Sequence, residues 1–353
     1  MKDILMQFCL VGKVISCQRY GEGHVNQTYL VITDTNQRYI LQRLSRTAFH
    51  DIPGLMANVA AVTDFLSARS ENPRDCMHLV CCRDGSTYYR DGEGEYWRML
   101  DYVPDSICLQ AAESPEDFYQ SALAFGRFQR MLNDFPAHTL TETIPNFHNT
   151  PDRYRIFHEV LRKDPLGRAE GLADEIAFVL AREAEAGALQ SMRDSGELPL
   201  RVTHNDTKLN NVMFDEKTRE ALCVIDLDTV MPGLVAYDFG DSIRFGASTG
   251  AEDEKDLDKI QVDLSLYRRY LEGFIPACGL LTRREIETLP LGAKLMTLEC
   301  GLRFLTDYLD GDHYFGIKRP EHNLDRARTQ FKLVADMERK WGEMQRMAEE
   351  FLP

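Results

Sequence analysis

The stretch HNDTKLNN at residues 204–211 is the most informative part of the sequence. It follows the pattern H-x-D-x-K-x-x-N, and Asp226 ends an apolar run fifteen residues after Asn211. Phosphoryl transfer to a hydroxyl needs a carboxylate that orients the hydroxyl and accepts its proton, a carboxamide and a second carboxylate that hold magnesium, and a cation. Asp206, Asn211, Asp226 and Lys208 suit these roles in that order. We expect His204 to brace the loop that carries them.

A kinase explains this pattern better than two simpler interpretations. An H-x-D pair in a polar loop before a buried strand often arises by chance, but the full set with a lysine, an asparagine and a strand-terminal aspartate is far more specific. A non-catalytic nucleotide-binding protein would be expected to have a damaged set, whereas here the aspartates and the asparagine are intact. The sequence therefore predicts an enzyme.

The rest of the chain changes character near residues 103–105. Before this point, short β-rich runs are separated by turn residues, and one segment has helical spacing. After it, long segments have helical periodicity, apart from one β-rich island at residues 200–228. The pattern predicts a β-rich N-terminal lobe (residues 1–103) and a mainly helical C-terminal lobe (104–353) that holds the β-rich island. The predicted strands are 13–19, 27–33, 38–41, 78–82, 87–90 and 96–103, and the predicted helices are 55–70, 114–135, 152–163, 174–193, 264–274, 283–308 and 324–350.

Four segments carry a resemblance to a known family. Residues 202–249 (VTHNDTKLNNVMFD…DFGDSIRFGAST) resemble the aminoglycoside phosphotransferase and choline kinase superfamily, and more closely the bacterial N-acetylhexosamine 1-kinases. The resemblance continues in residues 20–41, 298–315 and 320–324, so it spans nearly the whole chain. It implies an α+β, protein-kinase-like two-lobe fold of the aminoglycoside phosphotransferase type. The implied reaction is ATP-dependent phosphorylation of the anomeric (C1) hydroxyl of N-acetylglucosamine and N-acetylgalactosamine, which gives the sugar 1-phosphate.

The resemblance also implies nucleotide-binding residues in the first lobe. Gly21 and Gly23 lie between two predicted strands and would form a flap over the phosphates. Gln42 occupies the strand position at which such kinases usually have a lysine that holds the α- and β-phosphates. The role of that cation then passes to Arg43 or Lys208, or is left to magnesium. ATP and Mg²⁺ are the expected cofactors, because Mg²⁺ is usually held jointly by the protein and the phosphates.

The acceptor is expected to meet three further residues. The resemblance places His24, Arg303 and Tyr314 around the sugar, where arginine and tyrosine can bond hydroxyls and an acetamide carbonyl. Buried polar partners would reject a sugar that lacks the acetamide, because their own donors would then be unpaired. The alternative is a kinase of the same superfamily for another small hydroxyl compound: an aminoglycoside, an amino alcohol or a different sugar.

Two further aspartates receive separate roles. Asp238 opens the string Asp238-Phe239-Gly240, which spells the magnesium motif of protein kinases. It lies 27 residues after Asn211, too far for a short hairpin between two metal ligands, and the resemblance implies that it opens a helix and braces the catalytic loop. Asp228 either touches a second magnesium ion or points away across the turn. Only eleven residues separate Asp226 from Asp238 and no A-P-E follows, which excludes the peptide platform of a protein kinase.

Composition narrows the partners further. The chain has 353 residues and is 44% hydrophobic and 27% charged, a composition that excludes a disordered chain. Its net charge of −15 argues against nucleic acid or an anionic membrane as a partner. The nine cysteines show no C-x-x-C spacing, which suggests free thiols in a reducing compartment. No apolar run reaches membrane-spanning length. We expect a cytoplasmic enzyme with a small-molecule substrate; the sequence carries no signal of its oligomeric state.

Overall fold

A computed structural model describes Met1–Gly21 and Val25–Pro353 and divides into two compact units. Unit 1 comprises Met1–Leu109, Met131–Pro145 and Asn210–Pro232. Unit 2 comprises Gln110–Arg130, Asn146–Leu209 and Gly233–Pro353. Unit 1 thus holds the predicted N-terminal β-rich region together with two later segments.

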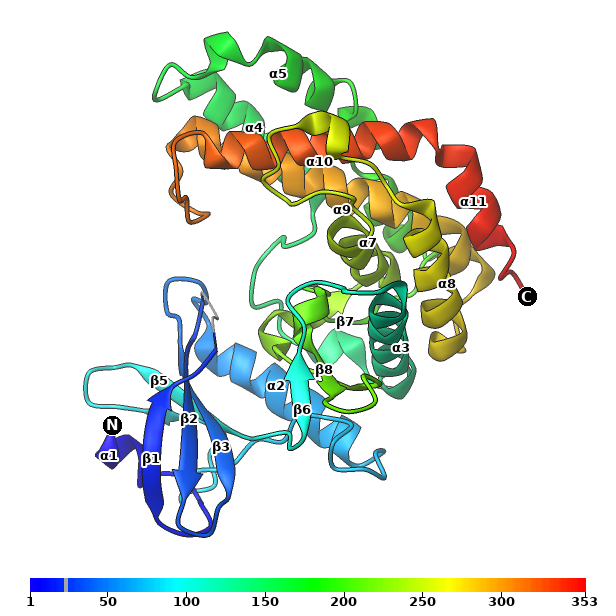
Figure 1. Cartoon of the computed structure of the whole chain (residues 1–353). Coiled ribbons are helices and arrows are strands. Elements are labelled where there is room, and N and C mark those ends of the chain that lie inside the picture. Colours follow the sequence, from blue (N-terminus) through cyan, green and yellow to red (C-terminus); the bar gives the residue numbers. More distant parts are fainter. Residues whose placement is uncertain (22–24) are drawn as a thin grey trace. The chain divides into compact units, whose positions relative to one another are not determined.

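An antiparallel five-stranded sheet forms the first part of unit 1 (Figure 1). Its strand order is β1-β2-β3-β5-β4, and Thr28 of β2 and Arg98 of β5 both pair with Gln42 of β3. One helix, α2, follows β3 and begins after Asp51, whose carboxylate accepts a hydrogen bond from the Gly54 amide. The strand bounds are β1 Val14–Arg19, β2 Gln27–Thr33, β3 Arg38–Leu44, β4 Tyr89–Arg90 and β5 Tyr96–Asp101, and α2 is Ile52–Ser67.

The two faces of this sheet differ in character. Successive side chains of a strand point to opposite faces. Tyr39 and Leu41 of β3 and Met99 of β5 belong to an apolar core cluster on one face, together with residues of the short helix α1 (Lys2–Leu5). Gln42 and Arg98 alternate with these residues and therefore belong to the other face. Two polar side chains, one from β3 and one from β5, therefore lie side by side on that face and share a hydrogen bond.

A three-stranded antiparallel sheet forms the second part of unit 1. Its order is β6-β8-β9, with β6 at Ser106–Cys108, β8 at Val212–Asp215 and β9 at Ala221–Val224. The predicted strand at residues 78–82 is wrong. The chain there makes only isolated bridges, Leu79 with Leu100 and Phe8 with Cys82, within the part of the chain that the structure describes.

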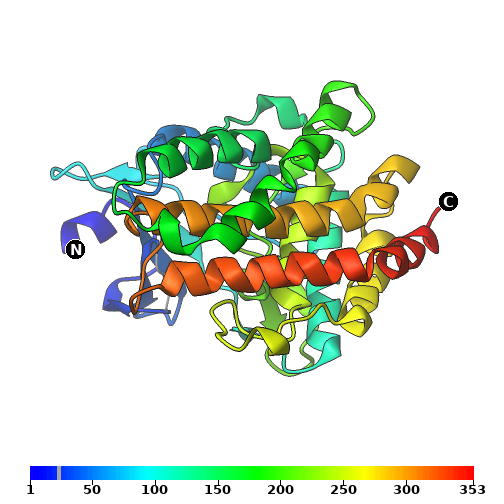
Figure 2. The same ribbon diagram turned by 90° about the horizontal axis from the view of Figure 1, so that it is seen from above.

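Helices make up most of unit 2 and pack around α9. This long helix packs against α7, α10 and α4, and Figure 2 shows α10 running alongside α9. The string Thr282-Arg283-Arg284-Glu285 predicts a capping box from the sequence, and the structure shows that box at the start of α9. The bounds are α3 Pro115–Met131, α4 Thr150–Lys163, α5 Ala173–Leu180, α6 Ala188–Asp194, α7 Val235–Gly246, α8 Leu264–Cys278, α9 Arg283–Asp310, α10 His322–Arg339 and α11 Trp341–Glu349. Along Met1–Gly21 and Val25–Pro353, no helix combines the length and apolar character that crossing a bilayer requires.

A glycine contact fixes α7 against α9. A Cβ atom on Gly240 would lie 2.3 Å from the carbonyl oxygen of Gly292, and one on Gly292 would lie 2.3 Å from that of Ala236. The two backbones therefore touch at this crossing, and any larger residue would push them apart. The contact matters for the site because the first turn of α7 carries Asp238.

Two predicted helices are interrupted in the structure. The segment 174–193 contains α5, a 3₁₀ turn at Glu183–Glu185, and α6, rather than one helix. Its middle residues bind other elements: Arg182 pairs with Glu338 at 2.6 Å and Glu185 with Lys294 at 2.6 Å. The segment 324–350 likewise divides into α10 and α11 at Lys340, whose ammonium donates to the Val262 carbonyl at 2.7 Å.

Candidate active site

The catalytic loop begins where β7 (Arg201–Thr203) ends, in unit 2. The His204 side chain is fully buried, with its ring edge-on to Phe125 and Phe128 at centroid distances of 5.5 and 6.0 Å. Its Nδ1 accepts a 3.3 Å hydrogen bond from the Asp206 amide. His204 is thus packed and bonded as a support of the loop, as the sequence predicts.

Asp238 braces the same loop from the first turn of α7. Its fully buried carboxylate accepts hydrogen bonds from the amides of His204 (2.9 Å) and Asn205 (2.8 Å) and from Gln129 Nε2 (2.8 Å). Burial raises the pKa of the Asp238 carboxyl above its ordinary value, although these bonds oppose the rise. The predicted role of Asp238 as a brace at the start of a helix is confirmed. Two of its three donors are backbone amides of the catalytic loop, so this carboxylate holds the loop in place.

A second aspartate of α7 extends this brace. Asp241 Oδ2 accepts a 2.9 Å bond from the Thr207 amide, and the Thr207 hydroxyl donates to the Asp238 carbonyl at 2.6 Å. Arg244 donates to Asp241 Oδ1 at 2.9 Å. The backbone on both sides of Asp206 is therefore tied to α7. Sequence inspection did not identify Asp241, because nothing in the motif indicates which polar residue of the following helix would face the loop.

Asp206 and Lys208 form an ion pair at the surface of unit 2. Lys208 Nζ lies 2.7 Å from Asp206 Oδ1, and about a third of each side chain is exposed. The Asp206 carboxylate raises the pKa of Lys208 further above its ordinary value. Lys208 therefore stays protonated at neutral pH, and Asp206 stays accessible. The structure thus brings these two predicted site residues together.

Asn211 and Asp226 lie at one end of the β8–β9 hairpin of unit 1. Val212 pairs with Val224, and the Ile225 amide donates to the Asn211 carbonyl at 2.8 Å, so Asp226 follows directly. Asp226 has left-handed backbone angles (φ 60°, ψ 58°) and an exposed side chain. Such strained non-glycine residues concentrate at functional sites. A carboxamide and a carboxylate at one hairpin end offer the oxygen ligands that Mg²⁺ prefers, so this donor set fits the ion.

Asp228 faces the sheet of unit 1. Its two carboxylate oxygens accept bonds from Arg98 Nη1 and from Asn26 Nδ2, the latter at 2.5 Å. Arg98 also donates from Nε to Gln42 Oε1 at 2.8 Å. The sequence left open whether Asp228 touches a second magnesium ion or points away across the turn. The structure shows its side chain turned to Arg98 and Asn26. Sequence inspection missed Arg98, although a single arginine inside an otherwise apolar strand (YWRML) is a signal that could have been used.

The predicted flap is described only in part. Gly21 has a positive φ of 71°, a conformation that favours glycine, and a Cβ there would meet no atom within 4 Å. Gly23 and His24, the other predicted residues of this segment, lie outside the described residues. Gln42 is the one predicted nucleotide-binding residue of unit 1 with described side-chain bonds: besides Arg98, it contacts Thr28 Oγ1 at 3.1 Å.

Arg303 and Tyr314 meet in unit 2. Arg303 Nη2 lies 3.4 Å from the Tyr314 hydroxyl, and its guanidinium lies over the rings of Phe147, Tyr314 and Phe315 at 5.3–5.5 Å. Arg303 is half-buried, whereas Tyr314 is 68% exposed, so the expectation that both are buried partners is wrong for Tyr314. The arrangement nevertheless gathers a fork of N–H donors and three aromatic rings at one place.

A buried carboxylate lies behind this aromatic cluster. Glu299 of α9 accepts bonds from His148 Nδ1 (2.9 Å) and the Thr150 hydroxyl (2.7 Å). Burial disfavours its charge, but His148, Arg303 and Arg153 together hold the pKa of Glu299 below its ordinary value. Among the described residues, His148 Nε2 and Arg153 Nε are buried without a hydrogen-bond partner. Buried polar atoms of this kind are rare in folded proteins and point to a missing partner. Sequence inspection had not singled out this group.

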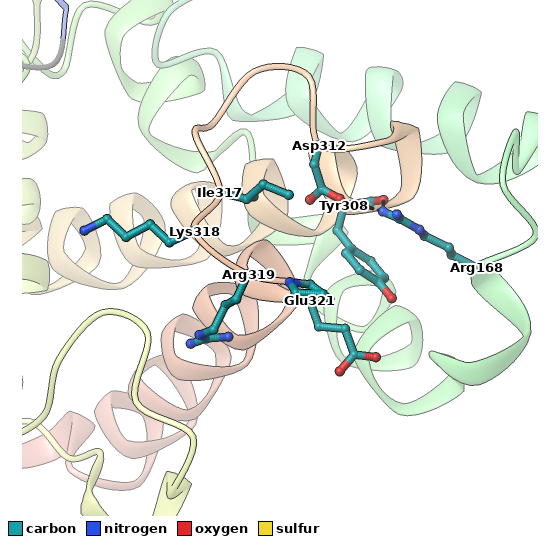
Figure 3. A pocket seen from close by; sticks show the side chains of 8 residues that line it. Arg168, Tyr308, Asp312, Ile317, Lys318, Arg319 and Glu321 are labelled. Atoms are coloured by element: carbon teal, nitrogen blue, oxygen red, sulfur yellow. Dashed lines mark hydrogen bonds and ion pairs between the residues drawn. The ribbon is translucent and has the colours of Figure 1, made fainter.

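A pocket of about 480 Å³ lies at the C-terminal end of α9 and contains none of the predicted site residues (Figure 3). Arg168 pairs there with Asp312 at 2.7 Å and lies 4.5 Å above the Tyr308 ring. Arg319 is paired with Asp325 outside the lining. The two arginines are thus already neutralised by nearby carboxylates. The lining comprises Arg168, Tyr308, Asp312, Ile317, Lys318, Arg319, Pro320 and Glu321.

Solved structures of small-molecule kinases share this fold. An aminoglycoside phosphotransferase from Alicyclobacillus acidocaldarius has a TM-score of 0.67 at 14% identity, covering 99% of this chain and 97% of that one. An amicoumacin kinase in complex with AMP-PNP and Ca²⁺ has a TM-score of 0.59 at 12% identity, covering 99% and 92%. The predicted mixed α+β, protein-kinase-like fold is therefore confirmed.

Sequence comparison identifies the family. A homoserine kinase from Chelativorans sp. (strain BNC1) is 28% identical over 305 residues, which are 85% of this chain and 82% of that protein. The model of the phosphotransferase enzyme family (APH) matches residues 16–272, a span that includes the catalytic loop, the β8–β9 hairpin and Gln42. The activity supported by these matches is ATP-dependent phosphorylation of a small hydroxyl compound. With more than half of its length matched by this model, the chain belongs to the phosphotransferase enzyme family (APH).

Proposed function

We propose that the chain transfers phosphate from ATP to the anomeric hydroxyl of N-acetylhexosamines, giving N-acetylglucosamine or N-acetylgalactosamine 1-phosphate. The proposal rests on the resemblance of four segments to N-acetylhexosamine 1-kinases and on one structural observation. That observation is the grouping of Arg303 and Arg153 with Phe147, Tyr314 and Phe315 in unit 2.

The charges of this group favour a neutral, oxygen-rich acceptor. Burial lowers the pKa of Arg153, and Arg303 lies close enough to lower it further; Glu299 is the buried carboxylate beside them. Two guanidinium groups with one such carboxylate disfavour a polycation or a quaternary amine. Arginine N–H groups suit a carbonyl or hydroxyl oxygen, and the exposed ring of Tyr314 suits the apolar face of a sugar.

In the proposed reaction, Asp206 orients the anomeric hydroxyl and accepts its proton. The anomeric hydroxyl is more acidic than the other ring hydroxyls, so a carboxylate of ordinary basicity suffices. Lys208 stays charged beside Asp206 and offsets negative charge on the transferred group. The network from Asp238 and Asp241 fixes the backbone on both sides of Asp206, which keeps the base in place.

Asn211 and Asp226 are the residues that we propose hold Mg²⁺. When bound, Mg-ATP supplies the phosphoryl group and an ion that neutralises phosphate charge. Gly21 and Gly23 are proposed to cover the phosphates, with Gln42 on the strand beneath them. His24 is proposed as a sugar-binding residue with Arg303 and Tyr314.

A homoserine kinase is the second candidate. The 28% identical relative over 85% of the chain favours it, and the α-carboxylate of homoserine could bind the Arg153–Arg303 pair. An ammonium group would have to be accommodated as well. Aminoglycosides and amino alcohols fit less well because they bring cations without a carboxylate.

An acceptor panel distinguishes these candidates. The purified protein is given Mg-ATP with N-acetylglucosamine, N-acetylgalactosamine, glucose, galactose, homoserine or an aminoglycoside, and ATP consumption is measured. We expect the N-acetyl sugars to be much better acceptors than glucose and galactose, with a 1-phosphate product by phosphorus and proton NMR. A 6-phosphate product excludes the 1-kinase, and preferential turnover of homoserine selects the second candidate.

Arg303→Ala tests the acceptor group itself. The variant should narrow the preference for N-acetylglucosamine over glucose while changing ATP affinity little, because a site built for the acetamide loses its donor. Arg155→Ala, which removes an exposed arginine from α4, is the matched control and should leave the preference unchanged. An unchanged preference in Arg303→Ala places the acetamide elsewhere.

A further inference from the structure

A glutamine occupies the position of the expected strand lysine in unit 1. Gln42 stands on β3 at the position where the resemblance leads one to expect a phosphate-binding lysine. Its partner across the ladder is Arg98 of β5. Directly opposed residues in an antiparallel pair project from the same face of the sheet, so a guanidinium lies beside Gln42 on the face opposite the apolar core.

Arg98 is held in a single orientation. Its side chain is 1% exposed, its Nε donates to Gln42 Oε1 at 2.8 Å, and its Nη1 donates to Asp228 Oδ1. Gln42 is itself fixed by Thr28 at 3.1 Å. Neither Arg98 bond uses Nη2, so part of the guanidinium fork is not involved in holding the side chain in place.

Asp228 serves as the counter-ion of this arginine. Both of its oxygens are engaged, one by Arg98 and the other by Asn26 Nδ2, and Asn26 Oδ1 accepts from the Ser45 amide at 3.0 Å. Three neighbouring segments therefore position one buried ion pair: the start of β2, the end of β3 and the turn after Asp226. A buried ion pair is weak evidence for stability, because desolvation offsets its attraction. Stability alone therefore does not account for this ion pair.

The other cations considered for this role are less suitable. Arg43 follows Gln42 directly, so it projects from the opposite face of β3, and it is 37% exposed with a loose 3.8 Å contact to Glu95. Lys208 is paired with Asp206 at 2.7 Å in unit 2. Arg98 is the cation that shares a face and a hydrogen bond with the residue in the lysine position.

We infer that Arg98 replaces the strand lysine and binds the phosphates of the nucleotide, with Gln42 orienting it and Asp228 as its counter-ion. The inference rests on the nucleotide site of the proposed function and assigns its cation. Through the turn that joins Asp228 to Asp226, the same ion pair also fixes the backbone next to a proposed magnesium ligand.

The test measures nucleotide binding by calorimetry, without an acceptor. Removing Arg98 alone would leave Asp228 buried and unpaired, so Arg98→Met is combined with Asp228→Asn. We expect Mg-ATP affinity to fall about tenfold or more, as expected for the loss of hydrogen bonds to a charged group. Adenosine affinity should stay within about twofold, because adenosine has no phosphates. Arg90→Met, which removes an exposed arginine from the neighbouring strand β4, is the control and should change neither affinity.

Two further variants keep the inference open to refutation if the double variant does not fold. Arg98→Lys keeps the charge but loses the planar fork, and it should weaken Mg-ATP and not adenosine. The second variant combines Arg98→Met with Gln42→Lys and keeps Asp228. It should recover most of the Mg-ATP affinity that the Arg98→Met, Asp228→Asn double variant loses. The recovery is expected because the lysine restores a cation on the face of the sheet from which Arg98 projects.

The opposing outcomes are distinct. If the Arg98 variants bind Mg-ATP as the parent does, or lose ATP and adenosine affinity equally, the role of Arg98 is structural and the inference is wrong. If Arg43→Met loses ATP affinity selectively while the Arg98 variants keep it, the cation is Arg43. If the parent protein itself does not bind Mg-ATP, the proposed function fails as well.

Discussion

Asp206 is the residue on which the proposed chemistry depends most directly. Replacing it with asparagine keeps the size of the side chain but removes the proton acceptor, so turnover should fall by about 10²- to 10⁴-fold. Nucleotide affinity should remain close to that of the parent, because the proposed nucleotide ligands are other residues. The measurement is kcat together with ATP titration by calorimetry. Turnover of Asp206→Asn within about tenfold of the parent would assign the base to another group.

Asp226 and Asp238 are two aspartates in opposite environments. Asp226 is exposed at the end of the β8–β9 hairpin, whereas Asp238 is fully buried and holds His204, Asn205 and Gln129. Asp226→Ala should therefore abolish Mg-ATP turnover in a folded protein. Asp238→Ala leaves buried donors unpaired at about 1–3 kcal/mol each and should mainly lower stability.

Thermal unfolding and magnesium-dependent nucleotide binding distinguish the two variants. A stable Asp238→Ala protein that has lost magnesium dependence, together with an Asp226→Ala protein that retains it, would reverse the assignment. The magnesium ligand would then be Asp238, despite its distance from Asn211 in the sequence. In that case the Asp-Phe-Gly string would have the role that it has in protein kinases.

At the scale of elements, Glu299 joins α9 to the segment that leads into α4. Its carboxylate binds His148 and Thr150, and neighbouring cations hold its pKa below the ordinary value of 4.5 despite burial. A depressed carboxylate pKa contributes stability that is present above the unfolded pKa and is lost as pH falls through the folded pKa. Glu299→Gln should therefore be less stable than the parent at neutral pH, and this difference should shrink below pH 4.5.

Chemical unfolding at several pH values measures this difference. Asp310→Asn, at the end of the same helix, is the matched control because it removes an exposed carboxylate, so its effect on stability should be small at every pH. A difference between Glu299→Gln and the parent that is constant from neutral to acidic pH would mean that Glu299 does not titrate differently in the folded state.

The helices and strands show which structural features the sequence predicts correctly and which it does not. Strand β2 was predicted at its observed bounds, and the capping box at Thr282 is present, because both depend on local chemistry. The break between α5 and α6 was missed because Arg182 and Glu185 bind α10 and α9, and no local pattern records such distant partners. The strand predicted at residues 78–82 has the right composition but lacks a continuous ladder.

The residues of the candidate site also divide into those that a local pattern predicts and those that only distant contacts reveal. Asp206, Lys208, Asn211 and Asp226 follow from spacing in one short stretch and one strand end. Arg98 could not be paired with Asp228 from the sequence, since 130 residues separate them and only the fold brings them into contact. Residues that act through long-range contacts remain hidden in a single sequence, even when the motif they support is evident.

At the scale of the whole molecule, net charge acts over distances that individual contacts do not. The chain has a formal charge of −15, which attracts cationic solutes and has little effect on neutral ones. Salt screens such attraction, with a Debye length of about 10 Å at 0.1 M. The response of the acceptor KM to ionic strength therefore reports the charge of the acceptor.

The proposed acceptors are neutral sugars, so their binding should be nearly independent of salt. At saturating Mg-ATP, the KM for the best acceptor of the panel should change by less than about twofold between about 20 mM and about 300 mM salt. Holding ATP at saturation separates this effect from that of salt on the anionic nucleotide. A polycationic aminoglycoside would instead lose electrostatic attraction, and its KM would rise several-fold over that range. A strong salt dependence of the best acceptor would contradict a neutral sugar and would favour a cationic substrate of the same family, because the charge of the whole chain and not one side chain sets the response.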